Sequence, residues 1–116
     1  MSPVATTVLI VDDHPSFRSV ARLLLESEGY DVVGEAPDGA RALELAAELT
    51  PDVVLLDLNM PGMDGFEVAR RMPDGPSIVL VSSRDARDIG PLDARVSGFI
   101  PKGELSGAAL RSVLSA

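Results

Sequence analysis

The stretch of sequence that decides the fold is VVLLDLNMPGMDG, residues 53–65. Four apolar residues run into a carboxylate, Asp57, and a turn rich in Asn, Pro and Gly follows. A continuous apolar run of this length is typical of a strand that is buried on both faces. The sequence therefore predicts a buried strand with an acid at its carboxyl end, followed by a turn whose bare backbone can approach a ligand.

Other short apolar runs have the same composition, and amphipathic segments lie between them. The predicted strands are residues 7–11, 31–34, 53–56, 78–81 and 98–101. Buried strands that alternate with helices predict an α/β fold, an open parallel sheet with helices on both faces and right-handed crossovers. Because no repeat or linker interrupts this alternation, residues 1–116 are expected to form a single domain.

The helix ends have recognisable signals. Pro15 opens the first helix and Gly29 closes it, and Asp38 caps the second. Asp64 and Glu67 have the spacing of a capping box and start a third helix. The apolar residues expected to face the core are Phe17, Val20, Ala21, Leu24 and Leu25 in the first helix and Leu43, Ala46, Ala47 and Leu49 in the second.

The last third of the chain is less regular. Residues 83–96 are polar and carry Gly90 and Pro91 where a helix interior would be, so a short or irregular fourth helix is expected there. Residues 104–114 are amphipathic and predict a final helix.

Composition limits the possible functions. The net charge is -8, and the chain has one Tyr, three Phe and no Trp, so direct nucleic-acid binding is not expected. Without cysteine, neither a disulfide framework nor a thiolate metal site can form. We expect no membrane association and a cytoplasmic location, because no apolar run is long enough to span a bilayer and the amino terminus lacks an export pattern.

Polar residues follow the predicted strands where ligands bind in open α/β sheets, outside the carboxyl ends. These residues are Asp12, Asp13, Asp57, Ser82, Ser83 and Lys102. Because all of these ends meet at one edge of a parallel sheet, we expect three carboxylates, a hydroxyl and an ammonium to converge there.

Such a cluster of acids needs a cation, since neighbouring carboxylates raise one another's pKa when no positive charge lies among them. Oxygen ligands favour Mg²⁺ or Mn²⁺, held by Asp13, Asp57 and the backbone carbonyl of Asn59, with Asp12 holding a metal-bound water. Asp57 would then be a desolvated carboxylate that can attack phosphorus. Lys102 would balance the charge that develops on the phosphoryl oxygens.

Four motifs in order, LIVDDHP, LLDLNMPGMDG, VLVSS and GFIPK, resemble those of the receiver domain of two-component response regulators, the CheY-like superfamily. The resemblance covers essentially the whole chain, which would make residues 1–116 a single receiver domain. It implies a flavodoxin-like (βα)5 fold with strand order 2-1-3-4-5. It also implies phosphotransfer to Asp57 from a histidine kinase or a histidine phosphotransfer protein.

The same resemblance assigns two switch residues. Ser82 corresponds to the hydroxyl that bonds the phosphoryl group, since Ser83 fits the small residue that normally follows it. Phe99 matches the aromatic switch position. One departure lies beside the lysine: the family usually has Pro directly after it, whereas here Gly103 follows Lys102.

Simpler interpretations of single residues stay open. Asp12 and Asp13 would also cap the first helix, Lys102 would also suit a solvated loop, and Phe99 an ordinary core position. His14, the single histidine of the chain, is expected to start the first helix and not to donate a phosphoryl group.

We expect a stand-alone receiver that accepts a phosphoryl group and changes conformation to control a downstream protein. Only self-phosphorylation and autodephosphorylation are expected as chemistry, so it is not an enzyme in the usual sense, and no organic cofactor is implied. The alternative is the amino-terminal receiver part of a DNA-binding transcription regulator, because DDHPSFR resembles the start of receivers joined to helix-turn-helix domains.

Two other classes fit less well. A phosphatase of the haloacid-dehalogenase type would need a second Asp at position 59, where this sequence has Asn59. A flavodoxin would need a Gly- and hydroxyl-rich loop after the first strand, where this sequence has DDHPSF.

Overall fold

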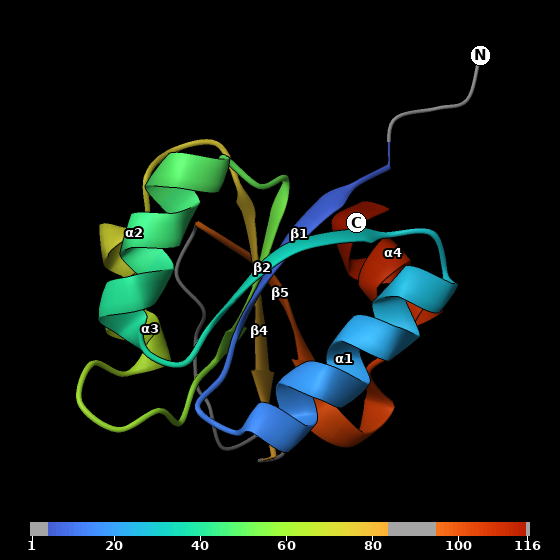
Figure 1. The fold of residues 1–116 in the computed structure, drawn as a ribbon, viewed down its shortest axis with the longest axis horizontal. Helices are drawn as coiled ribbons and strands as arrows, with labels where there is room; N and C mark the ends of the chain where they lie inside the picture. Colours follow the sequence, from blue (N-terminus) through green and yellow to red (C-terminus); the bar gives the residue numbers. More distant parts are fainter. Residues whose placement is uncertain (1–4, 84–94, 116) are drawn as a thin grey trace.

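A five-stranded parallel sheet forms the centre of the structure, a computed structural model that describes residues 5–83 and 95–115 (Figure 1). The strands are β1 (Thr7–Val11), β2 (Asp31–Ala36), β3 (Val53–Asp57), β4 (Ser77–Ser82) and β5 (Val96–Pro101). Their order is β2-β1-β3-β4-β5, with every neighbouring pair parallel. This arrangement confirms the predicted flavodoxin-like fold and brings all carboxyl ends to one edge.

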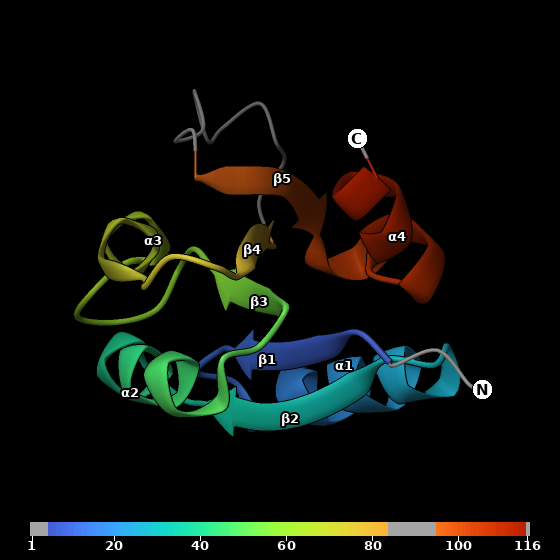
Figure 2. The ribbon, with the colours of Figure 1, turned by 90° about the horizontal axis from the view of Figure 1, so that it is seen from above.

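Helices cover both faces of the sheet. Figure 2 shows α1 (Pro15–Ser27) and α4 (Gly107–Ser115) on one face and α2 (Gly39–Leu49) and α3 (Gly65–Arg71) on the other. The connections from β1 to β2, from β2 to β3 and from β3 to β4 each contain a helix and lead to a parallel strand, as crossover connections do. None of the helices in the described ranges has the length and hydropathy that a membrane span requires.

Two apolar cores lie on opposite sides of the sheet, and β3 contributes to both. Val54 and Leu56 pack into the core under α2 and α3, whereas Val53 and Leu55 pack into the core under α1 and α4. Successive side chains of a strand point to opposite faces, so a central strand covered on both sides is apolar at every position. All residues of β3 are buried, including Asp57 at its end.

Most predicted boundaries agree with the structure to within two residues. The first strand and the start of α1 lie where the sequence places them, and Asp38 and Asp64 cap α2 and α3 by accepting from the backbone N–H groups of Arg41 and Glu67. We expected a short helix within residues 83–96, but most of this segment, residues 84–94, lies outside the described residues.

The final helix starts later than predicted. Lys102–Glu104 forms a 3₁₀ turn, and α4 begins at Gly107. The reason is a local cap: the Ser106 hydroxyl oxygen accepts a hydrogen bond from the Ala109 backbone N–H at 2.9 Å, which satisfies a donor of the first turn.

The predicted core faces of the first two helices are partly wrong. Val20 is 53% and Leu24 38% exposed, and Ala47 and Leu49 are also exposed. The predictions for Ala21 and Leu25 in α1 and for Ala46 in α2 are confirmed, since all three are buried, and Ala42 and Leu45 of α2 are buried as well. Each helix rests on a single sheet face, so only a narrow stripe is buried and flanking apolar residues meet solvent.

Gly65 allows α3 to start directly against the end of β3. A Cβ atom at this position would lie 2.8 Å from both the carbonyl oxygen of Asp57 and the Cα of Leu58. These are backbone atoms that cannot rotate away, so any side chain here displaces the segment that carries Asp57. Gly103, by contrast, has no heavy atom within 4 Å of its Cβ position.

We therefore predict that Gly65→Ala lowers the free energy of unfolding by about 1–3 kcal/mol, the usual cost of overpacking. This loss is expected although alanine is the better helix former. Gly103→Ala, the matched control, should change stability by less than about 0.5 kcal/mol. Urea denaturation of both variants measures the difference, and equal stabilities would contradict the tight contact at Gly65.

Candidate functional site

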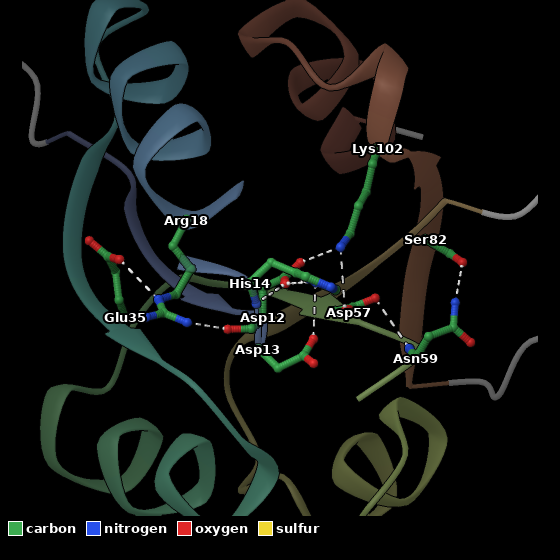
Figure 3. Close-up of polar contacts among 9 residues, drawn as sticks. All are labelled: Asp12, Asp13, His14, Arg18, Glu35, Asp57, Asn59, Ser82 and Lys102. Atoms are coloured by element: carbon green, nitrogen blue, oxygen red, sulfur yellow. Dashed lines mark hydrogen bonds and ion pairs between the residues drawn. The ribbon is translucent and has the colours of Figure 1, made fainter. Parts of the chain in front are cut away.

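The carboxyl ends of β1, β3 and β5 bring three charged side chains together (Figure 3). Asp12 follows β1 directly, Asp57 is the last residue of β3, and Lys102 follows β5. The Lys102 ammonium lies 2.7 Å from Asp12 Oδ2 and 3.5 Å from Asp57 Oδ2. Residues that are 45 positions or more apart in the chain thus share one ion-pair cluster.

Asp12 is completely buried and held through its backbone. Its N–H donates to the carbonyl of Ala36 at 3.0 Å, and its carbonyl accepts from Arg18 Nη1 at 2.6 Å. Its Oδ1 accepts the backbone N–H of His14 at 2.8 Å. The carboxylate therefore has little freedom to move.

Asp57 is the second buried acid, with a side chain that is only 2% exposed. Its Oδ1 accepts the backbone N–H of Asn59 at 3.2 Å. Burial raises the pKa of the Asp57 carboxyl, and the negative charge of Asp12 raises it further, while the Asn59 N–H and the Lys102 ammonium act in the opposite direction. The Asp57 carboxylate is thus desolvated, and its neighbours compensate its negative charge only in part.

Lys102 is not a solvated loop lysine, because its side chain is only 17% exposed. Besides the two carboxylates, its ammonium lies 4.6 Å from the centroid of the Phe17 ring of α1. A cation over an aromatic face is attracted by the ring quadrupole. Lys102 is also the single lysine in the sequence.

Ser82 is buried at the end of β4, whereas Ser83 is exposed. The Ser82 hydroxyl oxygen accepts a hydrogen bond from Asn59 Nδ2 at 2.7 Å. Asn59 therefore links the ends of β3 and β4, since its backbone contacts Asp57 and its side chain contacts Ser82. Phe99, in β5, is half-buried and packs against the core under α2 and α3.

The acidic residues fit a divalent cation. One ligand atom each from Asp12, Asp13, His14 and Asp57 can lie within 4.8 Å of all the others. Asp13 Oδ1 is enclosed and accepts no hydrogen bond. Asp12 Oδ2 is also enclosed, and it forms an ion pair with the Lys102 ammonium but accepts no hydrogen bond of good geometry. Enclosed carboxylate oxygens with spare acceptor capacity suit a hard cation such as Mg²⁺ or Mn²⁺.

Two supporting features did not emerge from the sequence. One is the Phe17 ring beneath Lys102. The other is an ion-pair network in which Glu35 of β2 contacts Arg18 Nε at 3.2 Å and Arg22 Nε at 2.7 Å. The i, i+4 spacing of Arg18 and Arg22 on one helix face was the available signal, but their acidic partner could be identified only from the packing of α1 against β2.

Comparisons with known proteins agree with the motif resemblance. A family model described as "Response regulator receiver domain" matches residues 8–113. The "Probable transcriptional regulatory protein NarL" of Mycobacterium tuberculosis is 42% identical, over 97% of this chain and 55% of its own length. The response regulator GacA of Pseudomonas aeruginosa is 41% identical, over 83% of this chain and 48% of its own length.

Solved structures show the same likeness. The receiver domain of Mycobacterium tuberculosis NarL superposes with a TM-score of 0.78 at 36% identity, covering 98% of this chain and 100% of that one. The response regulator domain of Thermotoga maritima CheB gives a TM-score of 0.83 at 28% identity, covering 97% and 96%. The chain spans about half the length of the curated relatives it matches.

The buried charge of Asp57 has a consequence for stability. Because burial raises its pKa in the folded state, folding favours the protonated form, and stability falls as pH rises from the carboxyl's ordinary range through the raised pKa. We predict that Asp57→Asn, which removes this charge, is more stable than the unsubstituted chain at pH 7 without divalent ions. The advantage should shrink as the pH is lowered.

Thermal unfolding at several pH values, with EDTA present, measures this effect. Asp31→Asn is the matched control, since Asp31 is an exposed carboxylate at the opposite edge of the sheet. A variant at position 57 that is less stable than the unsubstituted chain at pH 7 would show that the Asp57 charge is fully compensated by its neighbours.

Proposed function

Because the chain belongs to the response regulator receiver domain family, we propose that it accepts a phosphoryl group on Asp57 and thereby changes its binding to a partner protein. The observation that carries this proposal is the buried Asp57 carboxylate at the end of β3, beside the Lys102 ammonium and the other acids. The phosphodonor would be a histidine kinase or a histidine phosphotransfer protein of the cytoplasm.

The proposed reaction is a displacement at phosphorus. A carboxylate oxygen of Asp57 forms the new O–P bond while the bond from phosphorus to the donor breaks, and the donor leaves with that electron pair. Asp12, Asp13, Asp57 and the Asn59 carbonyl would hold Mg²⁺ or Mn²⁺, which neutralises charge on the acids and on the phosphoryl oxygens. No turnover of a further substrate is proposed, so the chain acts as a phosphoacceptor and not as a classical enzyme.

Lys102 supplies the second counter-charge. Its ammonium already bridges Asp12 and Asp57 and is kept near them by the Phe17 ring, so little reorganisation is needed when negative charge develops on a phosphoryl group there. Once the phosphoryl group is attached, the ammonium can exchange its contact with Asp57 for a contact with the new oxygens.

Ser82 and Phe99 are the proposed conformational switch. To bond the phosphoryl group, Ser82 would donate its hydroxyl proton to a phosphoryl oxygen, whereas its hydroxyl oxygen now accepts from the Asn59 side-chain amide. Phe99 lies two strands away from Asp57, packed against the core, and would repack as β4 and β5 adjust. Changing the ratio of two conformations from 1:99 to 99:1 needs roughly 5.5 kcal/mol of differential interaction.

A second candidate is the amino-terminal receiver part of a DNA-binding transcription regulator. The relatives that are named as transcriptional regulators are about twice as long as the part of them that this chain matches. Their additional length supports this second candidate. In that case the acidic receiver itself would make no nucleic-acid contact, and an attached domain would bind DNA.

We predict that incubation with acetyl phosphate and Mg²⁺ adds a single phosphoryl group, detected by intact mass. Asp57→Asn should abolish the adduct, and so should removal of the metal with EDTA. The matched control, Asp31→Asn, should be labelled like the unsubstituted chain. A label that persists on Asp57→Asn would place the nucleophile elsewhere.

We also predict that Lys102→Ala leaves Mg²⁺ binding largely intact but suppresses the phosphorylation-induced change in backbone amide NMR shifts. The reason is that Lys102 contacts the acids as a counter-ion and is not a metal ligand. Arg111→Ala, which removes an exposed positive charge from α4, is the matched control and should switch normally. Normal switching by Lys102→Ala would remove Lys102 from the mechanism.

A further inference from the structure

His14 places its imidazole beside the acids of the site (Figure 3). Its Nδ1 lies 3.0 Å from Asp12 Oδ1 and 3.2 Å from Asp13 Oδ1. The sequence indicated only that His14 would start a helix, and it is indeed the N-cap residue of α1. Its side chain, however, makes no capping hydrogen bond and is turned toward the carboxylates instead.

The backbone holds the imidazole in this position. His14 is extended, and its N–H donates to Asp12 Oδ1 at 2.8 Å, the same oxygen that its Nδ1 approaches. Pro15 occupies the first turn of α1 and restricts the chain that leaves His14. The side chain is 62% exposed, so the ring lies between the buried acids and solvent.

We propose that His14 Nδ1 is a metal ligand, and that this site therefore prefers a transition-metal cation such as Zn²⁺ to Mg²⁺. This inference rests on the proposed function, since it concerns the same divalent-cation site. It extends the ligand set from carboxylate oxygens to three carboxylates and an imidazole, from Asp12, Asp13, Asp57 and His14.

The preference follows from ligand chemistry. Imidazole suits Zn²⁺, Cu²⁺ and Ni²⁺, whereas Mg²⁺ takes oxygen ligands and usually keeps several waters. An imidazole nitrogen within reach of the acids thus adds affinity for Zn²⁺, Cu²⁺ and Ni²⁺ and almost none for Mg²⁺. Zn²⁺ would displace Mg²⁺ from this receiver at equal concentration.

Binding requires a change of tautomer at His14. In the metal-free site, an Nδ1–H can donate to Asp12 Oδ1. To ligate a metal, Nδ1 must present its lone pair, so in the neutral ring the proton resides on Nε2. The exposed half of the ring leaves Nε2–H able to donate to water.

His14 is the single histidine in the chain, so its ring nitrogens can be observed without overlap. The test uses long-range ¹H–¹⁵N NMR spectra of the full chain, titrated with Zn²⁺ and separately with Mg²⁺. We expect Zn²⁺ to move the Nδ1 signal to a metal-bound position with the ring proton on Nε2, and Mg²⁺ to leave Nδ1 unligated. Imidazole signals that respond alike to both ions would overturn the inference.

A second measurement uses competition calorimetry to obtain the ratio of Zn²⁺ to Mg²⁺ affinity. His14→Gln and His14→Ala should each lower this ratio by about 10- to 100-fold. Ser16→Ala, an exposed neighbour in the first turn of α1, should keep the original ratio. Amide spectra confirm that each variant is folded, and an unchanged ratio in both His14 variants would overturn the inference.

The proposed function and the role of His14 as a metal ligand can be refuted independently. Loss of the Mg²⁺-dependent phosphoryl adduct in the unsubstituted chain would refute the proposed function but leave a Zn²⁺-bound Nδ1 signal standing. A normal adduct together with an unligated imidazole in the presence of Zn²⁺ would refute only the role of His14.

Discussion

The burial of two carboxylates beside one ammonium is the constraint on which this site depends. Asp12 and Asp57 lie at the ends of neighbouring central strands, almost without solvent, and Lys102 is the counter-ion within 2.7 and 3.5 Å of them. Isolated buried charges are costly, so the acids need a positive charge nearby. Lys102 supplies one, and the enclosed oxygens of the cluster have capacity for a divalent cation.

The surrounding fold keeps these charges in place. Asp12 is tied to β2 through Ala36 and to α1 through Arg18, whose guanidinium in turn contacts Glu35. Gly65 lets α3 begin against the Asp57 backbone, so the end of β3 packs directly against the start of α3. A rigid support of this kind holds ligands near one geometry, which lowers the cost of reorganisation when a phosphoryl group or an ion binds.

Sequence reasoning reached much of the site, since residues that follow the strands of a parallel sheet must meet at one edge. Asp12, Asp13, Asp57 and Lys102 were identified in this way. His14 and Phe17 were not, because their contacts depend on where the first turn of α1 directs its side chains. The core faces of α1 and α2 were predicted only in part, because helical periodicity alone does not say how wide a stripe the sheet covers.

What the sequence determined by itself was therefore the order of strands and helices, their approximate ends and the chemistry carried by the strand termini. Apolar runs, caps and turn residues act over a few positions and can be read locally. Only the tertiary structure decided which oxygen faces the Lys102 ammonium, that Asn59 joins Asp57 to Ser82, and that the His14 ring turns toward the acids. Those contacts join segments that are distant in sequence or depend on side-chain rotamers, and packing of the whole sheet selects among them.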